Sequence, residues 1–178
     1  VSIILHISVR MCSSSFILKI DEDVIFNIDR FFLGVNRLFH SKHSAIYCNV
    51  WRKMKPKRKE DNKWYISRDQ FGGNYYPPFC SGSSYIITRK AAKEILKVTP
   101  NFPLIHVEDV LITGIISQAV HVRRVHLPTM FHRKSVFFSS CPKTSYGVRA
   151  LLSKHNFKSP SSIQKGWQNL QKECPVPK

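Results

Sequence analysis

Short apolar runs of strand length recur along the chain, and segments with apolar residues at helical spacing separate them. The runs are rich in β-branched and aromatic residues, which predicts four strands, at 15–20, 44–51, 84–88 and 120–127. The helical spacing predicts four helices, at 25–39, 89–98, 110–119 and 163–171. Strands that alternate with helices in this way are typical of a layered α/β domain.

The length and composition fit one domain with a hydrophobic core. The chain has 178 residues, and 43% of them are apolar, which excludes extensive disorder. The sequence contains no internal repeat and no Asn-x-Ser/Thr sequon. The apolar opening at 1–9 is too short to span a bilayer and is interrupted by His6, so we expect any membrane anchor to lie upstream.

The charge is strongly positive. There are 28 Lys and Arg against 11 Asp and Glu, a formal net charge of +17. This balance favours polyanionic partners such as nucleic acid, acidic lipid surfaces, sulfated glycans or phosphorylated small molecules. A basic run, RKMKPKRKEDNK, lies at 52–63. It indicates either a basic binding module for nucleic acid or sulfated glycan, or only a solvated loop.

The five cysteines are widely spaced and form no C-x-x-C pair, which argues against a zinc ribbon or a thioredoxin-like site. They are Cys12, Cys48, Cys80, Cys141 and Cys174. Wide spacing favours long-range disulfides made in an oxidising compartment, and the alternative is a set of buried free thiols. An odd number leaves at least one cysteine unpaired within the chain. Because Cys141 and Cys174 flank the last predicted helix, they are the first candidate pair.

An acidic triplet, Asp21-Glu22-Asp23, follows directly after the strand predicted at 15–20. Ligands gather at the carboxyl ends of strands in α/β sheets, so these side chains would face a crevice. Two carboxylates one residue apart can share Mg²⁺ or Mn²⁺, which would neutralise a diphosphate. The alternative is a helix cap or a solvated turn, because acidic residues favour helix N-termini.

A second acidic pair, Glu108-Asp109, precedes the helix predicted at 110–119. This pair is either a helix cap or the source of a general base. Between the two acidic groups, residues 63–85 contain seven aromatic residues mixed with Gly, Pro and Ser. Such a loop can stack on sugar rings while its polar groups bind hydroxyls, or its aromatics can simply fill the core.

Four blocks, taken in order, resemble the β-1,3-galactosyltransferase and β-1,3-N-acetylglucosaminyltransferase family, which are glycosyltransferase family 31-like hexosyltransferases. The blocks are FILKIDEDVIFN (16–27), KWY (63–65), YPPFCSGSSY (76–85) and EDVLITG (108–114). They are similar to the family's D-x-D, K-W-Y, Y-P-x-Y/F-x-S/A-G-x-x-Y and E/D-D-V blocks. The resemblance covers 12–127 well and the tail, 128–178, loosely, so we take 1–178 as a single partial domain.

The resemblance implies a fold and an activity. The fold would be α/β of the GT-A type, a mixed sheet flanked by helices. The activity would be that of an inverting hexosyltransferase that uses Mn²⁺ and moves galactose or N-acetylglucosamine from a UDP-sugar to a glycan hydroxyl, forming a β-1,3 linkage. The acceptor would be a glycoprotein or glycolipid glycan, and no nucleic acid is expected. The location would be the lumenal face of the Golgi membrane, as a type II membrane protein.

The family's metal and base residues have matching positions in this sequence. Asp23 would bind the metal, and Asp21 would lie beside the ribose or just outside the metal's ligands. Asp109 would deprotonate the acceptor hydroxyl. The family's late metal-binding histidine would be His155, because HNFKSPSSIQKGWQNL resembles the family's His, Pro and Trp pattern, and His132 is the alternative.

Other matching positions would contact the nucleotide and the sugars. Glu22 would complete the nucleotide-sugar-binding turn between the two aspartates, although the family has Asp at this position. The platform for the donor or acceptor sugar would consist of Trp64, Tyr76, Gly82 and Glu108.

The largest departure from the family concerns its N-terminal α/β half, which holds uracil and ribose. Only 20 residues precede Asp21 here. We therefore expect an N-terminally truncated domain, which is either an active part of an enzyme or an inactive relative. Metal-dependent UDP binding separates an enzyme from a basic binding module.

Overall fold

Two β-sheets organise the computed structural model, which describes residues 2–34, 38–132, 141 and 152–173. Among these residues the larger sheet has the strand order β1-β4-β3-β5, and the smaller sheet has the order β2-β7-β6. The strands of the larger sheet are β1 (Phe16–Ile20), β3 (Ala45–Trp51), β4 (Phe79–Thr88) and β5 (Arg123–His126). Those of the smaller sheet are β2 (Val24–Phe26), β6 (Phe131–His132) and β7 (Ser153–His155).

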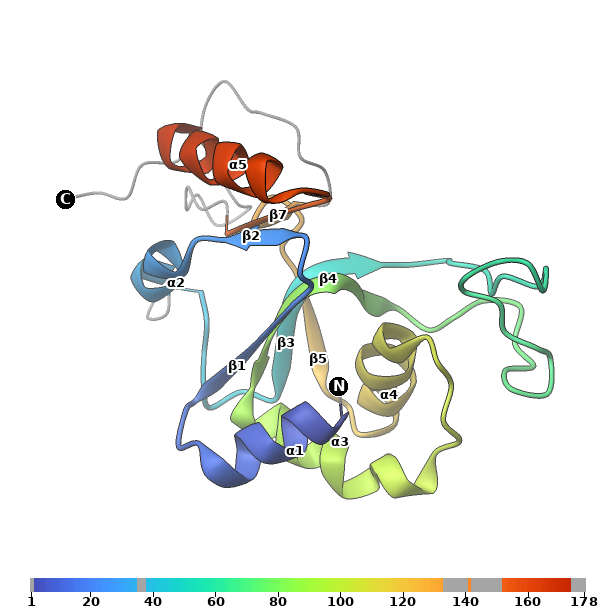
Figure 1. Cartoon of the computed structure of the whole chain (residues 1–178). Helices are drawn as coiled ribbons and strands as arrows, with labels where there is room; N and C mark the ends of the chain where they lie inside the picture. Colours follow the sequence, from blue (N-terminus) through green and yellow to red (C-terminus); the bar gives the residue numbers. More distant parts are fainter. Residues whose placement is uncertain (1, 35–37, 133–140, 142–151, 174–178) are drawn as a thin grey trace.

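The larger sheet is mixed, and β4 lies at its centre. β4 pairs antiparallel with β1 on one side and with β3 on the other, and β3 pairs in parallel with β5. The ends of β1, β3 and β5 therefore lie at the same edge of the sheet as the start of β4. The smaller sheet lies beyond this edge, next to the end of β1 (Figure 1).

Helices flank the larger sheet on one face, around the main hydrophobic core (Figure 1). This core takes Leu5 from α1 (Ser2–Met11), Ile95 from α3 (Arg89–Val98) and Ile112 from the helical segment η2 (Val110–Ile116). The opposite face packs against Phe31 of α2 (Ile28–Gly34) and Met130. The remaining helical elements are η1 (Thr99–Asn101), α4 (Ser117–Ala119) and α5 (Pro160–Glu173), the last of which packs on the smaller sheet through Leu170.

These elements confirm the predicted α/β fold with a mixed sheet flanked by helices. The strands predicted at 15–20 and 44–51 and the helix predicted at 89–98 are present nearly as expected. Thr88 caps that helix, because its hydroxyl accepts a hydrogen bond from the N–H of Ala91 at 3.2 Å. The tail helix predicted at 163–171 begins three residues earlier, where the Ser159 hydroxyl accepts from the N–H of Ser162.

The prediction of one helix at 25–39 is wrong at its start. Residues 24–26 form β2, and the helix α2 covers only Ile28–Gly34. The reason is long-range pairing: β2 lies antiparallel to β7, with Val24 opposite His155. A partner strand about 130 residues away in the sequence overrides the local helical spacing.

Three other predicted elements differ in extent or type. β4 begins at Phe79 rather than at 84, because Cys80 pairs with Val50 of β3. The segment predicted as a helix at 110–119 starts as a π-helix, in which the N–H of Ser117 donates to the carbonyl of Ile112. β5 covers only 123–126, since a turn at His121, with φ of 56°, precedes it. Within the described residues, no helix combines the length and the apolar character needed to cross a bilayer.

A disulfide joins the two central strands. Cys48 of β3 and Cys80 of β4 are bonded, with their Cα atoms 5.6 Å apart and both residues fully buried. This confirms the disulfide interpretation of the wide cysteine spacing for this pair. Cys12 is free and exposed. Cys141 is disulfide-bonded, and its expected partner Cys174 lies outside the described residues.

The disulfide yields a stability prediction. We expect the double change Cys48→Ser and Cys80→Ser to lower the free energy of unfolding by about 2–4 kcal/mol, because the bond closes a long loop in the unfolded chain. The sequence separation is 32 residues. Urea unfolding followed by fluorescence measures the loss. Cys12→Ser is the control and should leave the unfolding midpoint unchanged, and an equal midpoint in all three proteins would contradict the prediction.

Candidate active site

The acidic triplet forms the turn between the two sheets. The N–H of Asp21 donates to the carbonyl of Ser83 at 2.9 Å, which continues the pairing of β1 with β4 by one residue. The N–H of Val24 then donates to the carbonyl of Asp21 at 3.3 Å and closes the turn. Asp21 and Asp23 are partly exposed, and Glu22 is exposed.

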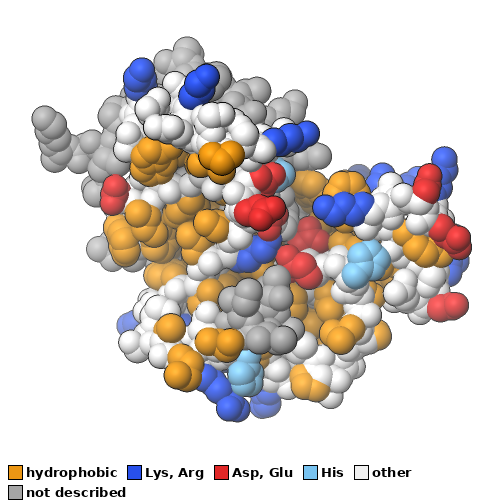
Figure 2. Space-filling model, viewed as in Figure 1, with side chains coloured by type: hydrophobic (Ala, Val, Ile, Leu, Met, Phe, Trp, Pro, Cys, Tyr) orange, Lys and Arg blue, Asp and Glu red, His pale blue; other side chains and the backbone are white. Residues whose placement is uncertain are grey.

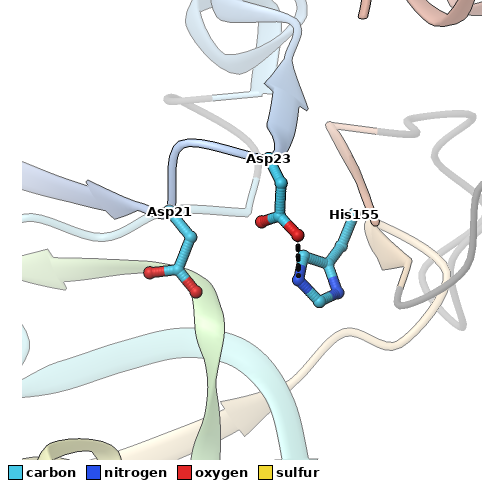
Figure 3. A group of neighbouring side chains, drawn as sticks. All are labelled: Asp21, Asp23 and His155. Carbon is cyan, nitrogen blue, oxygen red and sulfur yellow. Dashed lines mark ion pairs between the residues drawn. The ribbon is translucent and has the colours of Figure 1, made fainter. Parts of the chain in front are cut away.

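The pairing of β2 with β7 brings His155 beside this turn. His155 lies opposite Val24, and the N–H of Phe157 donates to the carbonyl of Asp23 at 3.1 Å. The Nε2 atom of His155 is 3.1 Å from Oδ2 of Asp23, and Figure 3 shows Asp21 to the left of this pair. One possible ligand atom from each of these three residues lies within 4.8 Å of the other two. The structure thus brings His155, which is distant in sequence, together with the two predicted aspartates.

For His132, the alternative metal-binding histidine, the structure describes the backbone only. His132 belongs to β6, where it lies opposite Lys154 of β7. Its side chain is outside the part of the structure that is described. The roles of Asp23 and His155 as metal ligands therefore stay a prediction, supported by their geometry.

Lys19 joins the acidic turn to the second acidic pair. Its ammonium group contacts the carboxylate of Asp21 and the carbonyl oxygen of Gly82, and it lies 3.4 Å from Oε1 of Glu108. A role for Lys19 in the site was not predicted from the sequence. A signal was present, because Lys19 is a charged residue in an otherwise apolar strand and shares a strand face with Asp21 two positions later.

Asp109 is held by two backbone N–H groups. Its Oδ1 accepts from the N–H of Val110 at 2.8 Å, and its Oδ2 accepts from the N–H of Gly82 at 3.1 Å. Gly82 is needed for this approach, since a Cβ atom there would lie 3.1 Å from Oδ2 of Asp109. Asp109 thus begins η2 as a cap and also faces β4, so the cap and base interpretations are compatible.

Burial raises the pKa of both members of this acidic pair. For Asp109, burial is the main cause, and the N–H groups of Val110 and Gly82 and the charge of Lys19 partly offset it. For Glu108, burial raises the pKa, the charge of Lys19 opposes the shift, and the charge of Asp109 adds to it. The Glu108 side chain is 35% exposed, but its Oε2 is buried and no described residue lies within hydrogen-bonding distance of it.

Tyr85 lies beneath these carboxylates and was also missed by the sequence analysis as a site residue. Burial raises its pKa well above the ordinary value, and the charges of Glu108, Asp109 and Asp21 add to the shift. Its hydroxyl is buried, with no hydrogen-bond partner among the described residues. Tyr85 pairs with Lys19 across β1 and β4, so both side chains rise from the same face of the sheet toward the acidic residues.

The predicted sugar platform is divided between two places. Gly82 and Glu108 lie in the acidic site, whereas Trp64 is 55% exposed in the loop between β3 and β4. Tyr76 is only 8% exposed, because its ring packs against Phe71 and Phe79 with centroid distances of 5.0 and 6.0 Å. Figure 2 shows the acidic side chains gathered near the middle of one face, where the upper, lower and right-hand parts of the molecule meet.

The raised pKa of Glu108 gives a pH-dependent prediction. The folded chain holds this proton more tightly than the unfolded chain, so the associated stability is present below the ordinary pKa of 4.5 and is lost as the pH rises through the raised value. We expect Glu108→Gln to gain stability relative to the natural chain between pH 4 and pH 7.5, by less than about 1 kcal/mol since the side chain is partly exposed.

Urea unfolding at both pH values measures this difference, and Glu60→Gln in an exposed loop is the control. A Glu108→Gln variant whose stability relative to the natural chain falls as the pH rises would contradict the assignment. The control should show the same difference from the natural chain at both pH values.

Comparison with known proteins places the chain in a family. The galactosyltransferase family model matches residues 1–128, which include all four blocks and begin before Cys12. The chain is 35% identical to "Beta-1,3-galactosyltransferase bre-2" of Caenorhabditis elegans over 136 residues, 74% of this chain and 38% of that protein. It is 31% identical to human "Beta-1,3-galactosyltransferase 2" over 162 residues, 88% of this chain and 36% of that protein.

A further relative, human "Beta-1,3-galactosyltransferase 5", is 26% identical over 174 residues, 93% of this chain and 53% of that protein. The chain therefore spans between about a third and a half of the length of the curated relatives it matches. Because the family model matches 1–128, a range that includes the acidic turn, the aromatic loop and the capped π-helix, and a relative that covers 74% of the chain is 35% identical, the chain belongs to the galactosyltransferase family.

Proposed function

We propose that this chain is the catalytic part of an inverting, metal-dependent glycosyltransferase. It would move galactose, or alternatively N-acetylglucosamine, from a UDP-sugar to a glycan hydroxyl. The observation that carries the proposal is the gathering of Asp21, Asp23 and His155 at the carboxyl end of β1, with Lys19 linking them to the pair Glu108-Asp109. The names of the relatives support a β-1,3 linkage and galactose as the first sugar to test.

The residues at the acidic turn fit Mn²⁺. Two carboxylates and one imidazole, each offering an atom within 4.8 Å of the others, form a mixed oxygen and nitrogen set that suits a divalent transition metal. Asp23 and His155 would hold the ion, and Asp21 would lie beside it or complete its ligands. When bound, Mn²⁺ would stabilise the negative charge that develops on the diphosphate leaving group.

Asp109 is the proposed general base. Its carboxylate would take the proton of the acceptor hydroxyl while that oxygen attacks the anomeric carbon from the side opposite UDP. One displacement from that side inverts the configuration, so an α-linked donor gives a β-linked product. Burial raises the pKa of Asp109, which makes its carboxylate a stronger base than that of an exposed aspartate. Hydrogen bonds from Gly82 and Val110 fix the direction of its two oxygens.

Lys19 has a positioning role in this proposal. Its ammonium holds the carboxylate of Asp21 and the carbonyl of Gly82, and it neutralises part of the charge of Glu108. The same contact keeps the backbone of Gly82 against Asp109. Loss of Lys19 would therefore disturb the metal side and the base side of the site together.

The compartment and the acceptor are proposals of the same kind. The disulfide between Cys48 and Cys80 supports an oxidising compartment, and we propose the lumen of the Golgi apparatus. There the acceptor would be a glycan on a glycoprotein or glycolipid, and the membrane anchor would precede this chain. The second candidate is a catalytically inactive relative that keeps the site geometry.

UDP binding tests the metal assignment. We expect calorimetry to detect UDP binding that requires Mn²⁺ and is lost in Asp23→Ala, because Asp23 would help to hold the ion that neutralises the diphosphate. Asp29→Ala is the matched control, since Asp29 is an exposed aspartate of α2 that has no part in the predicted site. Equal loss in both variants would reject the assignment of the ion to Asp23, and binding that is independent of Mn²⁺ would reject the metal site.

Transfer tests the base. We expect Asp109→Asn to lower the rate of galactose transfer from UDP-galactose about 10²–10⁴-fold, the range that a general base contributes, while Mn²⁺-dependent UDP binding remains. Gly82→Ala tests the position of the same carboxylate, because its new methyl group would lie 3.1 Å from Oδ2 of Asp109 and would push the carboxylate aside. A natural chain that binds UDP with Mn²⁺ but transfers no sugar would support the inactive relative instead.

A further inference from the structure

A basic loop lies outside the acidic site, and its cations have no part in the proposed reaction, although Trp64 and Tyr76 within it belong to the predicted sugar platform. This basic loop, residues 52–78, has eight Lys or Arg against three Asp or Glu, a net charge of +5. Seven of the eight cations are exposed, namely Arg52, Lys53, Lys55, Lys57, Lys59, Lys63 and Arg68. The basic loop projects to the right of the sheets between β3 and β4, and several Lys and Arg side chains lie on that part of the surface (Figures 1 and 2).

The eighth cation, Arg58, holds the basic loop in shape. Its guanidinium donates to the carbonyl oxygens of Ile66, Ser67 and Phe71 at 2.6–2.7 Å and to that of Gly73 at 3.0 Å. The N–H of Tyr76 donates to the carbonyl of Met54 at 2.9 Å and closes the base of the loop. The exposed cations are therefore carried on an ordered support, which lowers the entropy lost on binding.

Two exposed aromatic rings each lie beside an ammonium group. Trp64 is 55% exposed, with Nζ of Lys63 5.8 Å from its ring centroid. Tyr75 is 52% exposed, with Nζ of Lys55 5.5 Å from its ring centroid. A ring face can stack on the apolar face of a sugar while the neighbouring ammonium pairs with a sulfate or carboxylate. The two pairs together match a glycan that carries negative charges.

The basic loop is attached to the element that carries the proposed base. A Cβ atom on Gly114 of η2 would lie 3.0 Å from Cβ of Phe79 and 3.5 Å from Cγ of Pro77, so the end of the loop packs directly on η2. η2 begins at the residue after Asp109. The end of the basic loop is therefore fixed to the element that directly follows the proposed base.

We propose that the basic loop is a binding surface for an anionic glycan, with Lys55 and Lys63 pairing with its sulfate or carboxylate groups and Tyr75 and Trp64 stacking on its sugar rings. That this glycan is the acceptor of the transferred sugar rests on the proposed function. That the loop binds an anionic glycan at all rests only on the residues of the loop. The attachment to a sugar-transfer site favours a glycan over nucleic acid.

Direct binding measurements test the proposal without any donor sugar. The probes are a heparin-derived hexasaccharide (sulfated), an oligosialic acid (carboxylate only), chitohexaose (neutral) and a single-stranded DNA of charge equal to the heparin fragment. We expect the natural chain to bind one or both anionic glycans more tightly than chitohexaose and DNA. The double change Lys55→Glu and Lys63→Glu should weaken glycan binding roughly tenfold, since two exposed charge contacts become repulsive.

The matched control is the double change Lys90→Glu and Lys93→Glu, which alters the net charge equally on two exposed residues of α3. We expect it to keep the affinity of the natural chain. Equal weakening in both variants, unchanged affinity in the loop variant, or DNA or chitohexaose binding as tight as the anionic glycans would overturn the proposal. The transferase proposal is judged separately by Mn²⁺-dependent UDP binding, so the two can fail independently.

Discussion

The arrangement of the site depends on Lys19. Four carboxylates, those of Asp21, Asp23, Glu108 and Asp109, lie around the carboxyl end of β1, and their mutual repulsion would be costly in a partly buried region. The ammonium of Lys19 contacts Asp21 and Glu108 at once and also the carbonyl of Gly82. Because β1 positions Lys19 between the turn and η2, one cation permits two acidic groups with different proposed roles to stay close together.

The second constraint is the close approach of η2 to β4. Gly82 has no side chain to separate its backbone N–H from the Asp109 carboxylate, and Gly114 likewise lets Phe79 and Pro77 pack against the π-helix. The Cys48–Cys80 disulfide and the buried rings of Tyr76 and Phe79 belong to the same core and hold the start of β4 in place. The edge of the sheet beside the acidic site is therefore held by a disulfide, by close packing at two glycines and by buried rings.

The same bracing connects the site to the basic loop. The loop leaves β3 at Trp51 and returns into β4 at Phe79, so its two ends are adjacent strands of the central sheet. Arg58 orders the interior of the loop by donating hydrogen bonds to backbone carbonyls. The other Lys and Arg side chains of the loop are exposed. Part of the strong positive charge of the chain is thus concentrated in a loop separate from the acidic site, an arrangement that would keep the proposed anion-binding surface apart from the proposed metal site.

Local patterns along the sequence were sufficient for the strands at 15–20 and 44–51, for the helix at 89–98 and for the family, because each depends on residues close together in the chain. The sequence also indicated Asp23 and His155 as ligands of one metal ion through a family resemblance, and the structure places their side chains 3.1 Å apart. Only the tertiary structure decided that residues 24–26 form a strand, that this strand pairs with 153–155, and that Lys19 and Tyr85 face the acidic pair. The physical reason is that pairing between distant strands sets these contacts, and the energy of that pairing outweighs the local preference of a short segment.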